Sequence, residues 1–186
     1  KVIGSGIGTV TNQFVDANMS AGSIIQVQNF MISNGVDSIS NQSVSSTTFG
    51  ETALLKTITP TATSSTIYIR FDLHGIYNNA VAGNATKVAL YRDIGGAGYG
   101  ALSPLTGGAF ANHVGYESGT QGNLEDASFS VLDSPNTTSV VTYRVYVARL
   151  AASGYGRYLA NAPDQAIITL MEIAGWIILL KMLYFY

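Results

Sequence analysis

Few side chains of this sequence could perform chemistry, and they are widely spaced. Neither of the two histidines, His74 and His113, has a cysteine or a second histidine at the spacing that a transition-metal site requires. The carboxylates Glu125, Asp126 and Asp133 are of the type that binds calcium or forms a glycosidase pair. Adjacent carboxylates at the entrance of a strand are, however, more often a solvated edge that discourages strand pairing. We therefore predict no metal site, no cofactor and no enzymatic activity.

Two other motifs give weak signals. The glycine-rich run at residues 96–100 is not set between a strand and a helix, so a phosphate-binding loop is not indicated. Asn-x-Ser/Thr sequons start at Asn18, Asn41, Asn84 and Asn136. These asparagines would carry glycans only if a eukaryotic secretory pathway made the protein.

Tyrosines in glycine- and asparagine-rich segments are the better binding candidates, namely Tyr77, Tyr99, Tyr116 and Tyr155. A tyrosine offers a flat apolar face and a hydroxyl group, which suits sugar rings and protein receptors alike. The alternative for each one is that it fills a gap between loops. Tyr99 and Tyr116 flank the long glycine-rich insertion at residues 94–106, which we expect to be a surface loop, and they are the strongest candidates.

Composition limits the classes of function. The chain has 186 residues, which is the length of one domain with a core of its own. Only 11% of the residues are charged, against about a quarter in ordinary soluble proteins, and small neutral polar residues replace them. Such surfaces are common in extracellular and virion β proteins. A net charge of −2 provides no electrostatic footprint for nucleic acid, so no nucleic-acid partner is expected.

Alternating patterns predict strands. Residues 67–74 alternate between apolar and polar side chains with a period of two, and residues 141–147 repeat the pattern. Shorter β-rich runs between turn signals predict further strands at residues 23–30, 49–59, 86–93, 109–116, 124–132, 156–160 and 166–173. The core is expected to include Ile67, Ile69, Phe71, Leu73, Val141, Tyr143 and Val145. With no amphipathic helix indicated, the pattern predicts an all-β jelly-roll β-sandwich over residues 23–175.

The two ends of the chain read differently from this domain. Residues 1–22 have no sustained period and are expected to form a stalk or linker. Residues 176–186 are apolar apart from Lys181 and too short for a bilayer span of about 20 residues, so no membrane insertion is expected. They are predicted to form a final strand or an arm, packed on their own sheet or on another subunit.

The strand at residues 166–174 is apolar on both faces, whereas an antiparallel strand with one face in water should alternate. One of its faces is therefore expected to meet another subunit or the C-terminal tail. The predicted interface residues are Ile168, Leu170, Trp176, Ile178 and Leu180.

Several short motifs resemble the head modules of virion fibres and appendages of tailed phages and other aquatic viruses. The most specific are Leu132-Asp133-Ser134-Pro135, Thr142-Tyr143 and Met171-Glu172-Ile173. Residues 22–27, the Ser/Thr-rich turn at 58–67, and Leu90-Tyr91-Arg92-Asp93 match the same module upstream. The resemblance covers roughly residues 22–175. It departs at the end, because such modules usually stop near Met-Glu-Ile whereas this chain continues to Tyr186.

The resemblance implies a jelly roll similar to the trimeric tumour-necrosis-factor-like fibre heads. It implies a homotrimer at the surface of a virion, with other virion proteins and a host-surface glycan or protein receptor as partners. Three functions stay open. They are a non-enzymatic fibre or appendage head that contacts the host, a capsid decoration or assembly protein, and a glycan-degrading appendage enzyme. The last is disfavoured because no carboxylate pair is set in a recognisable groove. The tyrosine-bearing loops favour binding, and the apolar tail favours assembly.

Overall fold

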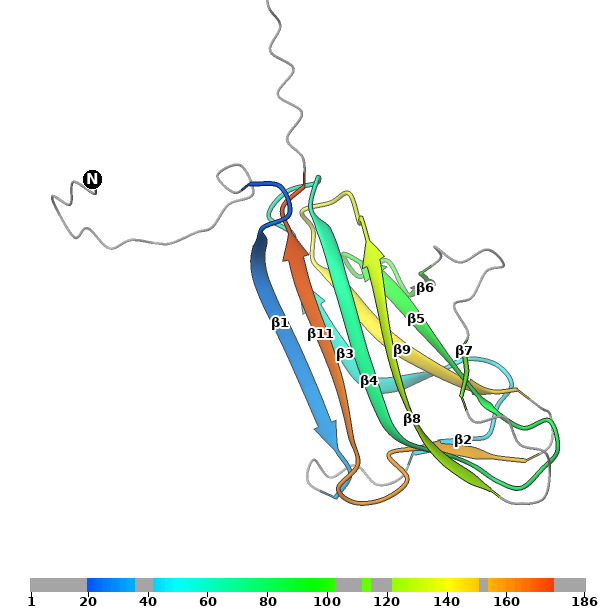
Figure 1. The fold of residues 1–186 in the computed structure, drawn as a ribbon. Helices are drawn as coiled ribbons and strands as arrows, with labels where there is room; N and C mark the ends of the chain where they lie inside the picture. Colours follow the sequence, from blue (N-terminus) through cyan, green and yellow to red (C-terminus); the bar gives the residue numbers. More distant parts are fainter. Residues whose placement is uncertain (1–19, 36–41, 103–111, 115–121, 151–153, 176–186) are drawn as a thin grey trace, which may run out of the picture.

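The computed structural model describes residues 20–35, 42–102, 112–114, 122–150 and 154–175, which form two antiparallel sheets packed face to face (Figure 1). These described residues contain no helix. The strands are β1 (Ile24–Ser33), β2 (Gln42–Val44), β3 (Gly50–Ile58), β4 (Thr66–Asn78), β5 (Thr86–Ile94), β6 (Gly100–Ala101), β7 (Asn112–Val114), β8 (Asn123–Asp133), β9 (Val141–Arg149), β10 (Gly156–Tyr158) and β11 (Gln165–Ile173).

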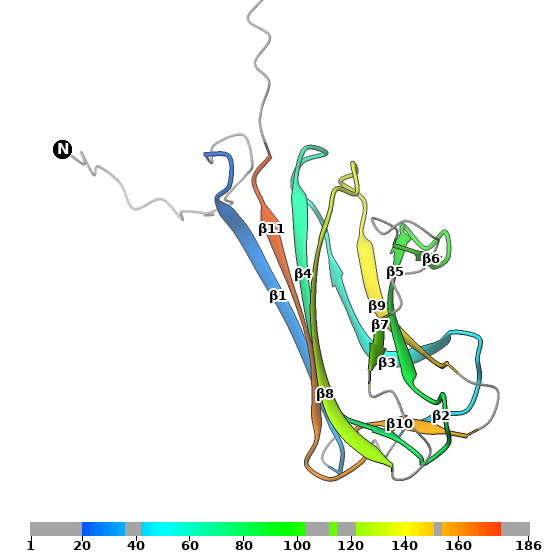
Figure 2. The ribbon, with the colours of Figure 1, turned by 45° about the vertical axis from the view of Figure 1, so that its right-hand side comes forward.

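The order of the strands is that of a jelly roll. The first sheet has the central order β1-β11-β4-β8, with β10 and β2 extending it beside β4. The second sheet has the order β3-β9-β5, and both β6 and β7 pair with β5. The long strands therefore alternate between the two layers along most of the chain, as Figure 2 shows. The predicted all-β jelly-roll sandwich is confirmed.

Every predicted strand overlaps an observed one. The sequence patterns missed the short strands β2 and β6, because two or three residues are too few to show an alternation. Strand β6 lies inside residues 94–106, so the segment expected to be only a surface loop contains a strand that returns to β5. Strand β4 is longer than predicted and continues past an irregularity at Gly75.

The core lies between the sheets. All the predicted core residues have an exposed fraction of 0%: Ile67, Ile69, Phe71, Leu73, Val141, Tyr143 and Val145. The rings of Phe71 and Phe129 lie 5.3 Å apart within this layer. One-sided burial therefore explains the period of two in β4 and β9.

The prediction that Ile168 and Leu170 form a subunit interface is wrong. Both side chains are 0% exposed and belong to the core of their own sandwich. Strand β11 lies between β1 and β4, so its inner face is covered by the second sheet of the same chain. Its other face is half-buried and carries Ile167, Thr169, Met171 and Ile173. The remaining predicted interface residues, Trp176, Ile178 and Leu180, lie outside the described residues, as do most of the predicted stalk and all of the predicted tail.

Two carboxylates fasten one end of the sandwich, where β4 begins and β8 and β11 end (Figure 1). Asp133 accepts hydrogen bonds at 2.8 Å from Arg92 Nη1 and at 2.7 Å from the hydroxyl of Tyr143. Burial and this bond to Asp133 raise the pKa of Tyr143. Asp133 is thus a structural hydrogen-bond acceptor that joins β5, β8 and β9.

Glu172 is the second of these carboxylates and is 0% exposed. Its oxygens accept hydrogen bonds from the backbone and hydroxyl of Thr61 at 2.6 and 2.8 Å, from Ser65 Oγ at 2.6 Å and from Gln26 Nε2 at 2.6 Å. Burial alone would raise the pKa of Glu172, but the bonds from Ser65, Gln26 and Thr61 together lower it below its usual value. The buried carboxylate of Glu172 therefore has hydrogen-bond donors for both oxygens, and these bonds join β1, β11 and the turn before β4.

Candidate functional site

Two of the four predicted tyrosines, Tyr77 and Tyr155, meet at a hollow of about 400 Å³ at the end of the first sheet opposite Asp133 and Glu172. We call this the tyrosine hollow. It is lined by Tyr77, Leu124, Tyr155, Arg157, Ala160 and Asn161. These residues come from β4, β8, β10, the residue directly before β10, and the segment that connects β10 to β11.

A bulge at Gly75 turns Tyr77 into the tyrosine hollow. The pairing of β4 with β8 shifts between Leu73 and Ile76, so Ile76 is buried in the core and Tyr77 points outward. Without the extra residue, the alternation would place Tyr77 inside. Gly75 has φ +66, and a Cβ there would lie 1.9 Å from Asp164 Oδ2. Only glycine fits this position in the present structure.

Tyr155 and Arg157 are set by the pairing of β10 with its neighbours. Arg157 lies opposite Tyr77 on β4 and opposite Ser43 on β2. The backbone N–H of Tyr155 donates to Asn79 Oδ1 at 2.7 Å. The rings of Tyr77 and Tyr155 lie 6.1 Å apart, and the guanidinium carbon of Arg157 is 5.3 Å from the centre of the Tyr155 ring. Two aromatic faces and one cation therefore share a partly exposed surface built on strands.

A second hollow of about 460 Å³ is lined by His74, Asp126, Pro163, Asp164 and Gln165. His74 Nδ1 lies 3.1 Å from Asp126 Oδ2, and the backbone N–H of Gly75 donates to Asp126 Oδ1 at 2.9 Å. The bond from Gly75, and then that from His74, lower the pKa of Asp126. Within the described residues, no group of three His, Cys, Asp or Glu side chains is placed to hold a metal ion.

Tyr99 lies elsewhere, on the outer face of the second sheet. Its ring is 5.9 Å from that of Tyr146, which stacks on Tyr91 at 3.9 Å. The guanidinium carbon of Arg144 is 5.7 Å from the Tyr99 ring. Tyr116, its expected companion, lies outside the described residues. The structure thus brings Tyr77 and Tyr155 together and leaves Tyr99 in a separate aromatic cluster.

Sequence reasoning missed Leu124 and Arg157, both of which line the tyrosine hollow. A signal for Arg157 was present, because it follows Tyr155 by two residues and so shares its side of an extended segment. Leu124 is 53% exposed, and an isolated exposed leucine gives no signal in the sequence.

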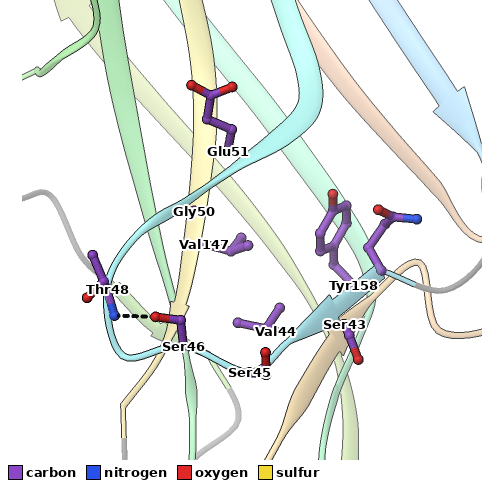
Figure 3. A pocket seen from close by; sticks show the side chains of 10 residues that line it. Ser43, Val44, Ser45, Ser46, Thr48, Gly50, Glu51, Val147 and Tyr158 are labelled. Atoms are coloured by element: carbon purple, nitrogen blue, oxygen red, sulfur yellow. Dashed lines mark hydrogen bonds between the residues drawn. The ribbon is translucent and has the colours of Figure 1, made fainter.

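A smaller pocket of about 150 Å³ opens between β2 and β3 (Figure 3). Hydroxyl side chains surround its mouth, among them Ser43, Ser45, Ser46 and Thr48. Val44, Val147 and Tyr158 are buried residues of its lining. The carboxylate in the lining, Glu51, is paired with Arg144 and accepts a hydrogen bond from Tyr146 at 3.0 Å. The lining therefore lacks a free acid–base pair for catalysis.

The sequons differ in their surroundings. Asn84 is 0% exposed, and its Nδ2 donates to Asn79 Oδ1 at 2.9 Å and to the carbonyl of Tyr155 at 3.0 Å. This amide is therefore inaccessible to glycosylation in the folded protein. Asn136 is exposed in the turn between β8 and β9, with φ 54. Asn18 and Asn41 lie outside the described residues.

Within the described ranges, no helix has the length and apolarity needed to cross a membrane.

No protein-family model matches the chain, and no curated protein matches it. Among solved structures, the chain is similar to the infectious bursal disease virus VP2 subviral particle, with 13% identity and a TM-score of 0.42 over 82% of this chain and 39% of the other. A structure of the Gx strain of that virus gives 12% identity and a TM-score of 0.39, covering 81% of this chain and 42% of the other. This chain thus spans about two fifths of their length. Its own strand order defines it as a jelly-roll β-sandwich protein.

Proposed function

We propose that this protein is a non-enzymatic structural protein of a virion. In this proposal it lies on the particle surface as a fibre or appendage head and attaches to a host-surface glycan or protein receptor. The motifs at residues 132–135, 142–143 and 171–173, the jelly roll and the low content of charged residues support this class of function. The observation that carries the attachment role is the tyrosine hollow, where Tyr77, Tyr155 and Arg157 converge.

The tyrosine hollow has the features of a recognition surface. Tyr155 is 38% exposed and Leu124 is 53% exposed, so apolar area is available at the rim. Tyrosine rings are rigid and bury large areas at a low cost in conformational entropy, and their hydroxyls remain free to donate or accept. Tyr77 lies on β4 and Leu124 on β8, and Tyr155 directly precedes β10 with its backbone N–H bonded to Asn79, so the positions of these side chains are fixed before a ligand arrives.

The same outer face offers a surface for assembly. Val27, Met171, Tyr68 and Leu132 are direct neighbours across β1, β11, β4 and β8, so they form one apolar row. Val27 is 51% exposed and Leu132 is 59% exposed. We propose that the homotrimer contact lies on this apolar row rather than at Ile168 and Leu170, because large apolar side chains in water favour association. The row also favours the second candidate function, a capsid decoration or assembly protein without receptor binding.

Attachment and assembly are compatible on one face. Tyr68 in the apolar row and Tyr77 in the tyrosine hollow lie on the same strand, β4. At about 3.3 Å per residue, the two sites are separated by roughly 30 Å along β4. A partner subunit on the apolar row would therefore leave the tyrosine hollow open.

Binding of the purified protein to host cells and to an array of glycans tests the attachment role. Tyr155→Ala should weaken binding by about tenfold or more, because it removes an exposed aromatic face. Tyr99→Ala tests the separate aromatic cluster, and under this proposal it should change binding by less than about twofold. Equal binding by wild type and Tyr155→Ala would exclude the tyrosine hollow as the attachment site. If the protein binds neither cells nor glycans, the assembly role alone remains.

A further inference from the structure

Arg157 differs from the paired arginines of the chain. Arg70, Arg92 and Arg144 each form an ion pair, with Asp72, Asp133 and Glu51 respectively. Arg157 has no carboxylate partner within the described part of the chain, and its guanidinium lies against the ring of Tyr155. A half-buried guanidinium without a counter-charge is suited to an anion brought by a ligand.

The position of Arg157 is fixed by the sheet. Strand β10 pairs on one side with β4 and on the other with β2, so the backbone of Arg157 is held from both sides. The contact with Tyr155 holds the guanidinium beside the ring and uses none of its hydrogen-bond donors on a protein acid. Five N–H donors in a planar fork match a carboxylate or a sulfate in a bidentate manner.

We propose that the tyrosine hollow binds an acidic sugar, meaning a sugar ring that carries a carboxylate or sulfate group. The anionic group would accept hydrogen bonds from Arg157, and the apolar face of the ring would lie against Tyr77, since Arg157 already covers one face of Tyr155. The Asn161 side chain, also in the lining, supplies a donor and an acceptor for ring hydroxyls. This inference rests on the proposed attachment function and specifies its ligand.

The adjoining hollow sets the orientation of such a ligand. Its carboxylates, Asp126 and Asp164, are already hydrogen-bonded to the backbone of Gly75 and of Asn161 at 2.9 and 2.6 Å. They would repel an anion placed beside them while still accepting from sugar hydroxyls. The acid group is therefore directed toward Arg157, and the hydroxyls of a longer glycan toward Asp126 and Asp164.

The test compares sialyllactose, sulfated lactose and neutral lactose by isothermal titration calorimetry on the full chain. Wild type should bind at least one acidic sugar about tenfold or more tightly than lactose, since charge-assisted hydrogen bonds are roughly twice as strong as neutral ones. The two acidic arms distinguish a carboxylate from a sulfate. Arg157→Gln should abolish the preference over lactose, and Arg157→Lys should retain part of it. Arg70→Gln is the matched control and should leave the preference unchanged.

Several results would overturn the inference. One is equal binding of lactose and both acidic sugars, and another is an unaltered preference in Arg157→Gln. Failure of all three sugars to bind, with cell attachment still sensitive to Tyr155→Ala, would remove the acidic sugar and keep the attachment site. Cell attachment that is insensitive to Tyr155→Ala would remove the proposed function itself, and the inference with it.

Discussion

Gly75 lies at the bulge of β4 that turns Tyr77 into the tyrosine hollow, so Gly75→Ala is an informative perturbation. The residue has φ +66, a conformation that costs an alanine about 1–2 kcal/mol. The added Cβ would lie 1.9 Å from Asp164 Oδ2 and 3.0 Å from the backbone nitrogen of Ala160, so the Asp164 side chain must move. Movement breaks the 2.6 Å bond from Asn161 N–H to Asp164, a loss of about 0.5–1.5 kcal/mol. We expect the free energy of unfolding to fall by about 2–3 kcal/mol.

Gly83→Ala provides the matched control. Gly83 also has a positive φ, +79, but no atom lies within 4 Å of a Cβ built there. It should therefore lose only the conformational part, about 1 kcal/mol after the reduced entropy of the unfolded chain is included. In Gly75→Ala combined with Asp164→Ala, the clash is removed, so the two changes should couple by on the order of 1 kcal/mol.

Urea unfolding followed by far-ultraviolet circular dichroism measures these differences, with all variants at one protein concentration in case subunits associate. Gly75→Ala should also weaken sugar binding, because Asn161 loses the hydrogen bond from its backbone N–H to Asp164, whereas Gly83→Ala should not. Equal stability losses in Gly75→Ala and Gly83→Ala, or additive effects of Gly75→Ala and Asp164→Ala, would refute the contact argument.

Three further outcomes are expected. Phe71→Ala should lower the free energy of unfolding by about 3–5 kcal/mol, since the ring is fully buried, and a urea titration showing a loss near zero would contradict this. The lowered pKa of Glu172 means that its charged form stabilises the fold above the usual pKa of 4.5, and that this contribution disappears as pH falls further through the folded-state pKa. Wild type should therefore lose stability below pH 4.5 more steeply than Glu172→Gln in acid titrations of melting temperature, and parallel curves would exclude the linkage. Leu132→Asp should dissociate a trimer built on the apolar row, as measured by light scattering, while leaving the β spectrum unchanged; an intact trimer would place the contact elsewhere.

The strands with one buried face were predictable from sequence, because burial on one side imposes a period of two. Strands β4 and β9 show this directly, and their inward residues form the core. The inner face of β11 was taken for an interface because both faces of the strand are apolar, so no alternation in the sequence distinguishes them. The buried face also carries a charge, Glu172. Here the donors from Thr61, Ser65 and Gln26 satisfy it inside, and no local pattern reveals partners so far away in the chain.

The candidate site was predictable only in part. The residue type of Tyr77 and Tyr155 indicated binding, but their meeting depends on the pairing of β10 with β4, which is a long-range contact. It also depends on the bulge at Gly75, which reverses the side of Tyr77. A single glycine in a strand pattern suggests a bulge but does not say which way the following residues point. The tyrosine hollow therefore required the tertiary structure.

The residues that carry the resemblance to fibre heads act on the scaffold. Asp133 joins Arg92 to Tyr143, and Glu172 joins Gln26 to the turn before β4, so every matched segment supplies a bond at the same end of the sandwich. Loss of one partner would leave a buried carboxylate unsatisfied, which is costly, and this gives a physical reason for such residues to occur together. The residues that line the tyrosine hollow all lie outside the matched segments. Because the hydrogen-bonded motifs and the tyrosine hollow lie at opposite ends of the sandwich, residues at one end can be substituted without altering the other. Under the proposed function, the motifs therefore indicate the jelly roll, and Tyr155 and Arg157 determine which ligand it binds.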